Sequence, residues 1–389
     1  MRRFDTIVLG LGAMGSAAAY QLARRGNRVL GIDRFSPPHV RGSTHGDTRI
    51  TRLGIGEGAQ YTPLAMRSHR IWRDLERATG RTLLTTNGGL VLSSKARTSQ
   101  CHTDNFFANT IAAAQIHEIP HELLDAGQIR RRFPRFNVAD DECGYFEPGA
   151  GYVRPEECVR VQLELAEHHG ALLNRSERVS TFDASRSGVT VATDRDEYAA
   201  DMLIVTAGPW LPELVGAPVA RHLTVCRQVL CWFDIAGPET PFLPSNFPVF
   251  IWELQGRPQG IYGFPAIDGA RGGLKVATER YDQATTPDDA EPQVSDAETR
   301  AIYDDYVAPY ISGLSGQCVK AATCLYTVTP DFGFIIDTLP GAERVIVASP
   351  CSGHGFKHSA AIGEALAERV IDGASRQDLG AFALARFGG

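Results

Sequence analysis

Residues 4–33 read FDTIVLGLGAMGSAAAYQLARRGNRVLGID and alternate between two kinds of local structure. The apolar, β-branched run 4–9 predicts a strand that leads directly into the glycine-rich turn 10–15. Helix formers follow over 16–25, and the second apolar run 29–33 predicts another strand. This segment therefore predicts a strand, a turn, a helix and a second strand, which is the βαβ beginning of a parallel sheet.

The glycines of this turn have the spacing of a dinucleotide-binding fingerprint. Gly10 suits the tight turn, Gly12 allows the backbone to approach a pyrophosphate, and Gly15 allows close helix–strand packing. Asp33 ends the second strand, where an acid accepts a hydrogen bond from a ribose hydroxyl. The free N–H groups at the helix start would hold the phosphates. The fingerprint alone does not choose between NAD and FAD.

Length and composition limit the remaining possibilities. With 389 residues, the chain is long enough for about two domains. A net charge of -6 argues against nucleic acid or an anionic membrane as partner, and no stretch is long enough to span a membrane. The eight cysteines form no close CxxC pair, which indicates reduced thiols, and we expect a cytoplasmic protein.

The chain after Asp33 predicts further elements around a polar, glycine-containing loop at 42–52. It carries an amphipathic helix pattern and then a mixed helical and strand region before the apolar run 201–210. We expect helices at 61–78, 105–115, 121–132 and 155–170, a hairpin or bulged strand at 83–92, and strands at 178–182, 189–193 and 201–210.

From residue 218 onwards, the pattern changes to strands with alternating polarity and then returns to strands followed by helices. The alternation predicts an antiparallel sheet, and the return predicts that both ends of the chain share one cofactor domain. We expect antiparallel strands within 223–278, a solvated acidic loop at 285–293, a helix at 297–311, strands at 334–337 and 345–348, a glycine loop at 352–357 and a helix at 359–371.

These stretches, taken in order, resemble the monomeric sarcosine oxidase and N-methyl-L-tryptophan oxidase family of flavoenzymes. The resemblance runs along essentially the whole chain, and the ordered set of motifs is specific although each one alone is weak. Besides the glycine turn, the matching motifs are 45–52 (HGDTRITR) with 56–58 (GEG), 262–265 (YGFP), 273–275 (GLK), 324–327 (CLYT), 334–337 (FIID) and 352–357 (SGHGFK).

The resemblance implies an α/β fold with a Rossmann-like FAD domain of the glutathione-reductase type and an inserted α+β substrate domain on an antiparallel sheet. It places the FAD domain at 1–85, 146–216 and 320–389, and the substrate domain at 86–145 and 217–319. It further implies a monomer that oxidises a secondary amino acid to an imine and reduces O2 to H2O2. Open alternatives are a flavin dehydrogenase, a D-amino-acid oxidase relative, an NAD-dependent dehydrogenase and a non-catalytic flavin-binding subunit.

An amino-acid substrate brings a carboxylate, which an arginine and a second cation would recognise. Arg52 and Lys357 match the family's positions for these two cations. The alternative for Arg52 is a surface cation, or one paired with Asp47 or Glu57, and the alternative for Lys357 is a solvated lysine at a helix start.

The resemblance also assigns catalytic positions. Lys275, in an otherwise apolar strand, matches a lysine beside the flavin that assists reaction with oxygen, since a fixed positive charge stabilises developing superoxide. Arg49 and His45 match residues near the other flavin face, and His45 has the alternative of a purely structural role. Tyr262 matches an aromatic wall of the substrate site and Trp252 is a candidate cap, with a plain core aromatic as the alternative.

One position departs from the family. Sarcosine-type members carry a histidine four residues after the lysine, where this chain has Glu279. We expect Glu279 to contact the substrate and to favour a cationic or hydrogen-bond-donating side chain, or to move the pH optimum. Glu279→Gln should therefore alter substrate preference.

Cys324 matches the family cysteine that joins FAD through a thioether, and Arg49 could supply the positive charge that favours a thiolate. The alternative is a small buried hydrophobe. No metal site is expected. The full set expected to bind FAD is Gly10, Gly12, Gly15, Asp33, Arg34, Ser43, Thr44, Thr48, Arg49, Val179, Ala207, Gly208, Trp210, Cys324, Gly353, Gly355, Phe356 and Lys357.

Overall fold

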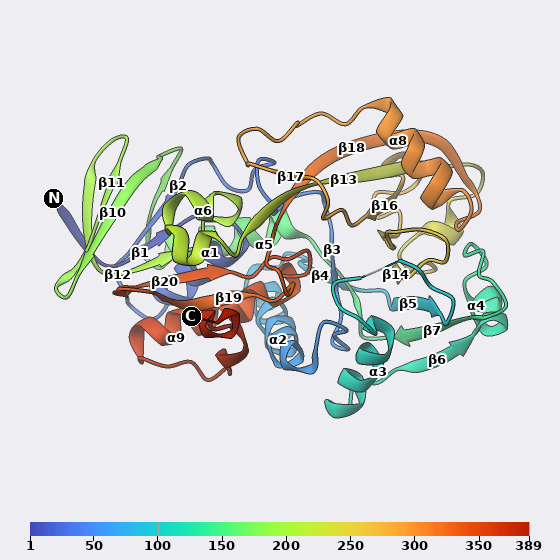
Figure 1. Ribbon diagram of the computed structural model, residues 1–389, viewed down its shortest axis with the longest axis horizontal. Coiled ribbons are helices and arrows are strands. Elements are labelled where there is room, and N and C mark those ends of the chain that lie inside the picture. The colour runs from blue at the N-terminus through green and yellow to red at the C-terminus, as the bar shows by residue number, and fades with distance from the viewer. Residues whose placement is uncertain (100, 389) are drawn as a thin grey trace.

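The structure is a computed structural model that describes residues 1–99 and 101–388. Two large sheets dominate it, one beside the N-terminus and one at the opposite end of the long axis (Figure 1). Among the described residues, no helix combines the length and apolar character that a membrane span requires.

The eight-stranded sheet holds the glycine turn. Its order is β10-β11-β12-β1-β2-β9, and β20 pairs with the second half of β12 and with β19. The pairs of β1 with β2 and β12, of β2 with β9 and of β12 with β20 are parallel, as the apolar run 201–210 predicts. Its strands are β1 (Arg2–Leu9), β2 (Val29–Asp33), β9 (Leu172–Arg175), β10 (Val179–Ser185), β11 (Gly188–Thr193), β12 (Glu197–Val205), β19 (Ile335–Leu339) and β20 (Ala342–Ser349).

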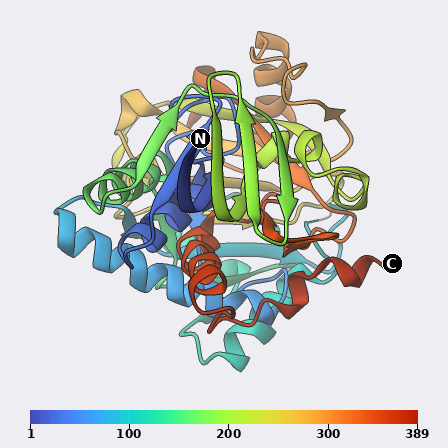
Figure 2. The same cartoon turned by 90° about the vertical axis from the view of Figure 1, so that its left-hand side faces the viewer.

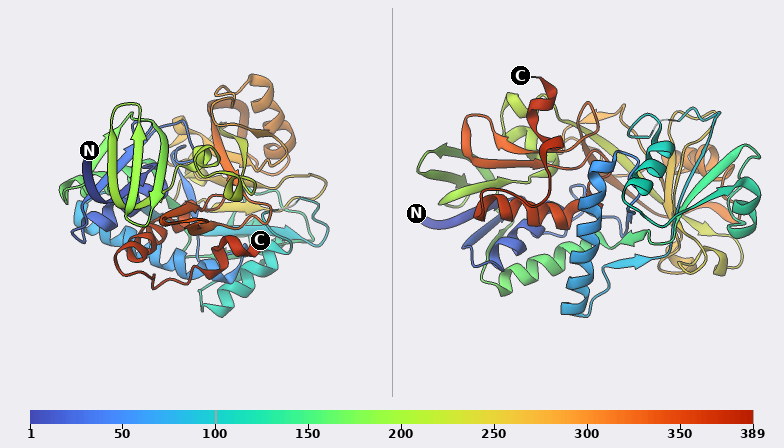
Figure 3. Two further views of the ribbon diagram at one scale, coloured as in Figure 1. Left: turned by 60° about the vertical axis from the view of Figure 1, so that its left-hand side comes forward. Right: turned by 90° about the horizontal axis from the view of Figure 1, so that it is seen from below.

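Helices α1 (Ala13–Ala23), α5 (Pro155–His168) and α9 (Ser359–Ile371) cover one face of this sheet (Figure 3). Because strand side chains alternate, Val8 faces these helices whereas Ile7 and Leu9 belong to the core on the other face. That second core includes side chains of α6 (Leu211–Leu214) and α7 (Ala217–Ala220), and the β10–β11 hairpin stands at one edge (Figure 2). Helix α2 (Thr62–Thr79) packs against α9.

The nine-stranded sheet has the order β17-β13-β16-β15-β14-β5-β7-β6, with β18 along β13. It is antiparallel apart from the β14–β5 pair. Its strands are β5 (Gly89–Ser94), β6 (Glu122–Asp125), β7 (Glu142–Glu147), β13 (Thr224–Ile235), β14 (Val249–Trp252), β15 (Ile261–Phe264), β16 (Leu274–Thr278), β17 (Ala284–Thr285) and β18 (Leu314–Val328). The accompanying helices are α3 (Phe106–Ile116), α4 (Ala126–Arg132) and α8 (Asp296–Ile302).

Three local predictions were wrong. The segment 83–92 is no hairpin: β4 (Leu84–Thr86) pairs with β8 (Gly151–Val153), which also pairs with β3 (Arg49–Thr51), whereas β5 enters the large sheet. The segment 121–132 begins as β6 because it pairs with β7, and the helix starts only at the Asp125–Gln128 capping box. The helix expected at 297–311 ends at Ile302 and continues as one π-helical turn.

Candidate functional site

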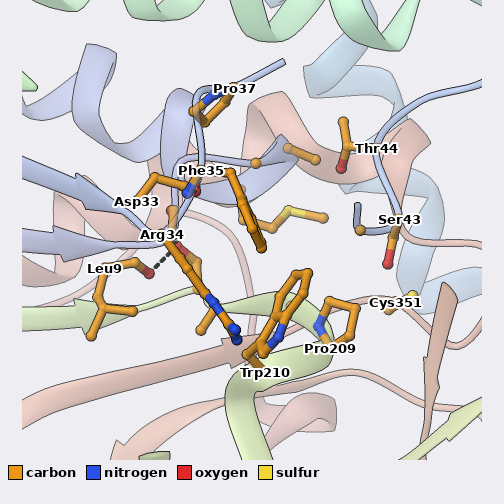
Figure 4. A pocket seen from close by; sticks show the side chains of 18 of the residues that line it. Leu9, Asp33, Arg34, Phe35, Pro37, Ser43, Thr44, Pro209, Trp210 and Cys351 are labelled. Carbon is orange, nitrogen blue, oxygen red and sulfur yellow. Dashed lines mark hydrogen bonds between the residues drawn. The ribbon is translucent and has the colours of Figure 1, made fainter. Parts of the chain in front are cut away.

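A long pocket, called here the glycine-loop pocket, opens along the carboxyl ends of β1, β2, β12 and β20 (Figure 4). This is the edge where open parallel sheets bind ligands. Its wall includes most of the expected cofactor residues, namely Gly10, Gly12, Asp33, Arg34, Ser43, Thr44, Arg49, Val179, Ala207, Gly208, Trp210, Gly353, Gly355 and Phe356.

The glycine turn has the close contacts that its spacing predicts. Gly10 has a φ of 87°, and a Cβ there would lie 2.5 Å from the Thr206 carbonyl oxygen. A Cβ on Gly15 would lie 1.7 Å from the Gly10 carbonyl oxygen. Gly12 is open by contrast, because its Cβ would meet only the Thr44 hydroxyl at 3.6 Å. Gly12 precedes α1 without a side-chain cap, so the first N–H groups of the helix are available to an anion.

The acid at the end of β2 is anchored by the backbone. One carboxylate oxygen of Asp33 accepts from the Leu11 N–H at 2.7 Å and the other from the Phe35 N–H at 2.8 Å. The rings of Phe35 and Trp210 lie 5.3 Å apart on the wall beside it (Figure 4). Asp33 is therefore fixed in orientation at the pocket.

Asp288, from the acidic loop expected to be solvated, contacts this wall. Its carboxylate accepts from Arg34 at 2.9 Å and from the indole N–H of Trp210 at 3.0 Å. The guanidinium of Arg34 also lies 5.7 Å from the Trp210 ring. The loop at 285–293 thus joins the nine-stranded sheet to the rim of the glycine-loop pocket.

Besides Nε of Arg52, two polar atoms in the loop at 42–52 are buried and lack a hydrogen-bond partner among the described residues. They are the Ser43 hydroxyl and Nε2 of His45. Burial, with Arg49 and Lys275 nearby, lowers the pKa of His45 to about 3, so the ring is neutral. Unpartnered buried polar atoms are costly, and they fit a polar group that completes the site.

Arg49 connects the remaining expected catalytic positions. It donates to the carbonyls of Ser43 at 2.7 Å and Thr48 at 2.8 Å, and its Nη2 lies 3.5 Å from Sγ of Cys324. Burial nevertheless raises the pKa of Cys324, with Arg49 acting in the opposite direction. Lys275 donates from Nζ to the carbonyls of Gly46 at 2.6 Å and Thr48 at 3.1 Å.

Lys275 is almost completely buried, since 2% of it is exposed. Burial, together with Arg49, lowers its pKa well below the ordinary lysine value. Its Nζ lies 4.6 Å from the centre of the Phe264 ring. Lys275, His45, Thr48, Gly15 and Cys324 stand behind the wall of the glycine-loop pocket rather than on it.

A second pocket, called here the charged pocket, adjoins the first. The two share Arg49, Tyr326, Gly353 and Phe356. Ionisable and apolar side chains line the rest: Glu57, Cys101, His102, Glu279, His354 and Lys357, with Ile50, Phe106, Ile251, Ile261, Tyr262 and Phe264, beside the backbone of Gly260. Tyr262 and Tyr326 approach with their hydroxyl oxygens 3.1 Å apart.

Glu57 is the centre of an ion-pair network at this pocket, the Glu57 cluster, formed by Arg52, Glu57, His102, Glu279 and Lys357. Its carboxylate lies 2.9 Å from Nη2 of Arg52, 3.2 Å from Nδ1 of His102 and 3.8 Å from Nζ of Lys357. Burial opposes ionisation of Glu57, but Lys357 and Arg52 hold its pKa well below the usual range. Burial lowers the pKa of Lys357 to about 8, opposed by Glu57.

His102 is a site residue that sequence reasoning missed. It precedes α3 and lies between two carboxylates, with Nδ1 3.2 Å from Glu57 and Nε2 3.0 Å from Glu279. Its segment is attached to the end of β14, where the Leu254 N–H donates to the Ser99 hydroxyl at 2.6 Å. No motif signals this residue, because its neighbours come from loops more than forty residues away in either direction.

The predicted substrate residues have different positions. Tyr262, Lys357 and Glu279 line the charged pocket. Arg52 forms an ion pair with Glu57, which is the alternative role considered above. It lies behind Glu57 and does not line the wall of the charged pocket. Trp252 is no cap: it lies in the core of the nine-stranded sheet and donates to Glu142 at 2.6 Å, because strand alternation directs its neighbour Ile251 into the pocket instead.

Within residues 1–99 and 101–388, no group of three or more His, Cys, Asp or Glu side chains is arranged to hold a metal ion. The eight cysteines are all free.

The family model described as FAD dependent oxidoreductase matches residues 5–369. Monomeric sarcosine oxidase from Streptomyces avermitilis is 40% identical over 380 residues, covering 97% of this chain and 96% of that protein. N-methyl-L-tryptophan oxidase from Yersinia pestis is 36% identical over 387 residues, covering 99% of both chains.

Solved structures share the fold. The amino acid oxidase NikD, essential for nikkomycin biosynthesis, superposes with a TM-score of 0.85 at 23% identity and covers 98% of both chains. Glycine oxidase from Geobacillus kaustophilus has a TM-score of 0.76 at 18% identity and covers 100% of both. At these identities the comparison concerns architecture, and it supports a Rossmann-type FAD domain joined to a sheet-based second domain.

Proposed function

The chain belongs to the family of FAD dependent oxidoreductases, and from this premise we propose that it oxidises a secondary amino acid, N-methylated or cyclic, to an imine. Oxygen is the electron acceptor and H2O2 the second product. The observation that carries the proposal is the charged pocket, which adjoins the glycine-loop pocket and presents cations from the Glu57 cluster to a carboxylate. The names of the two relatives above support the same substrate class.

The residues of the glycine-loop pocket fit FAD. Gly12 leaves room for the pyrophosphate at the start of α1, Gly10 allows the tight turn against Thr206, and Asp33 would accept from the ribose. Ser43 and His45 each have an unpartnered polar atom that would be available to the rest of the FAD molecule. When bound, FAD takes two electrons from the substrate and passes them to oxygen.

The protein's own contribution is orientation, charge and exclusion of water. We assign substrate carboxylate binding to Lys357, with Arg52 completing the pair through a change of partner from Glu57. Tyr262 would hold the apolar part of the substrate. Arg49 lies at the junction of the two pockets, where a fixed cation favours reduced oxygen species and anions. Lys275, which shares the Thr48 carbonyl with Arg49, and the neutral His45 stand behind the wall beside it.

We further propose that Cys324 is the point of covalent flavin attachment. Arg49 at 3.5 Å is the cation that would stabilise its thiolate. Acid precipitation tests this directly: flavin colour should remain with the protein pellet of the wild type and move to the supernatant in Cys324→Ala. Flavin that stays in the pellet of the variant would contradict the assignment. Cys351, another free cysteine, lies on the wall of the glycine-loop pocket and is the matched control for substitution.

The activity is tested with a panel of N-methyl and cyclic amino acids under air. We expect bleaching of the flavin on substrate addition without oxygen and H2O2 production with it. Flavin that is bleached by the panel but produces no peroxide would identify a dehydrogenase that uses another acceptor. If no amino acid of the panel bleaches the flavin, the proposed substrate class is refuted.

We also propose the domain division of the sequence analysis, with a monomer acting in the cytoplasm. The strands of the eight-stranded sheet all fall in the FAD-domain segments, which supports the division. The boundaries at 85/86, 145/146 and 319/320 fall inside β4, β7 and β18, so limits based on whole strands would lie a few residues away.

A further inference from the structure

The Glu57 cluster contains more positive than negative charge. Three cations, Arg52, Lys357 and His102, face two carboxylates, Glu57 and Glu279. Burial alone would lower the pKa of His102, but Glu279 and Glu57 outweigh it and raise the pKa to about 9, so the ring is an imidazolium at neutral pH. A buried excess charge is costly, and an anionic ligand would balance it.

The remaining groups near His102 add no negative charge to this balance. Tyr281 and His354 face its ring at centroid distances of 6.3 and 5.0 Å. Burial raises the pKa of Tyr281 well above its ordinary value and lowers the pKa of His354 to about 3, so both are neutral. Cys101 is also neutral, because burial raises its pKa. Arg49 adds a further cation at the junction with the glycine-loop pocket.

Glu279 is consequently not available to a cationic substrate. Its carboxylate lies 3.0 Å from Nε2 of His102, and 16% of its side chain is exposed. Apart from its ionisable side chains, the wall is apolar or aromatic and includes Phe106, Ile251 and Ile261. This arrangement contradicts the expectation that Glu279 selects a cationic side chain.

We propose that His102 sets the substrate specificity of the charged pocket: it neutralises Glu279, so that the pocket accepts amino acids whose N-substituent and side chain are uncharged and rejects those with a second cation. The inference deepens the proposed function and rests on it, because the proposed function is what makes the bound amino acid a substrate. His102 acts here through charge and positioning of Glu57 and Glu279, and no bond to it is made or broken.

The test measures binding rather than turnover. Isothermal titration calorimetry on the flavin-containing protein compares pentanoate with 5-aminopentanoate, which differ by one ammonium group at the far end. The wild type should bind pentanoate at least about tenfold more tightly, since about 1.4 kcal/mol of differential binding corresponds to a factor of ten. The ratio of the two dissociation constants reports the charge selectivity of the pocket.

Three variants then separate the roles. His102→Gln leaves Glu279 uncompensated, so pentanoate binding should weaken about tenfold and the ratio should fall towards one. Glu279→Gln should raise the ratio above the wild-type value, and the double variant should return close to the wild type. His168→Gln, at an exposed position near the end of α5, should change nothing.

A ratio in His102→Gln within about twofold of the wild type would overturn the inference. So would a lower ratio in Glu279→Gln, which is the result expected if Glu279 binds a substrate cation. If His102→Gln does not fold, the raised ratio predicted for Glu279→Gln and the near-wild-type ratio predicted for the double variant still decide. Because pentanoate is not oxidised, charge-selective binding without flavin reduction by any N-methyl amino acid would refute the proposed function alone.

Discussion

The two pockets differ in the groups that they offer to negative charge. The glycine-loop pocket offers backbone N–H groups at the start of α1 and neutral polar atoms, and its glycines act through the side chains they lack. The charged pocket uses ionised side chains from several loops, held by one another around Glu57. The first should therefore be sensitive to volume and the second to charge.

The largest effect should follow from adding one methyl group to the glycine turn. In Gly15→Ala, the new Cβ would lie 1.7 Å from the Gly10 carbonyl oxygen, and backbone cannot move aside as a flexible side chain can. We expect loss of bound flavin and a destabilisation of about 3 kcal/mol or more, measured by the ratio of flavin to protein absorbance and by urea unfolding. Gly149→Ala, which adds a Cβ with no atom within 4 Å, should retain both. Full flavin content in Gly15→Ala would show that the turn is not tightly packed.

A change of charge without a change of volume should affect the other pocket. Glu57→Gln removes the carboxylate that serves Arg52, His102 and Lys357, and leaves buried cations without a partner. Breaking a buried pair in this way costs about 3–5 kcal/mol, so urea unfolding should show a loss of that order. Asp74→Asn also breaks a pair with an arginine, but its side chain is 57% exposed, and it should cost less than about 1 kcal/mol. Equal losses in the two variants would mean that burial of the Glu57 pair carries no special cost.

His45, behind the glycine-loop pocket, and His102, on the charged pocket, should make the unfolding free energy depend on pH with opposite signs. The pKa of His45 falls from 6.5 to about 3 in the folded protein, so below pH 6.5 the unfolded chain binds the extra proton and stability declines with acidification. The pKa of His102 rises from 6.5 to about 9, so its contribution is complete below pH 6.5 and is lost as the pH rises through 9.

Urea unfolding across pH 5 to 9 measures both effects. At pH 5, His45→Gln should remove about 2 kcal/mol of the wild type's acid sensitivity, and His102→Gln should lose about 3 kcal/mol of stability below pH 6.5 that the wild type no longer has above pH 9. A difference between His102→Gln and wild type that stays constant across this range would show that the ring is neutral in the fold.

These contrasts explain what the sequence could predict. The turn at Gly10, Gly12 and Gly15 was predicted and found, because its function follows from contacts within a few residues and one adjacent strand. The presence of Lys357 and Glu279 at the charged pocket was also predicted, through the family resemblance. The partner of Glu279 was not predicted. His102 lies 177 positions away from Glu279 in the chain, and neither a hydrophobic period nor a motif predicts a contact between residues so far apart. Trp252 was misplaced by one residue of strand alternation, since Ile251 faces the pocket.

The smallest effect is expected at the exposed contact between the loop at 285–293 and the rim of the glycine-loop pocket. Asp288 holds Arg34 and Trp210 at the rim of the glycine-loop pocket, but 48% of its side chain is exposed, so water competes for the same groups. Asp288→Asn should change the unfolding free energy by less than about 1 kcal/mol. Its clearer consequence should be kinetic, with faster release of flavin in a variant that also carries Cys324→Ala. Asp289→Asn is the matched control, because the hydrogen bonds of Asp289 within residues 1–99 and 101–388 are to the nearby Thr286. Equal release rates in the two variants would show that the loop rests on the rim without closing it.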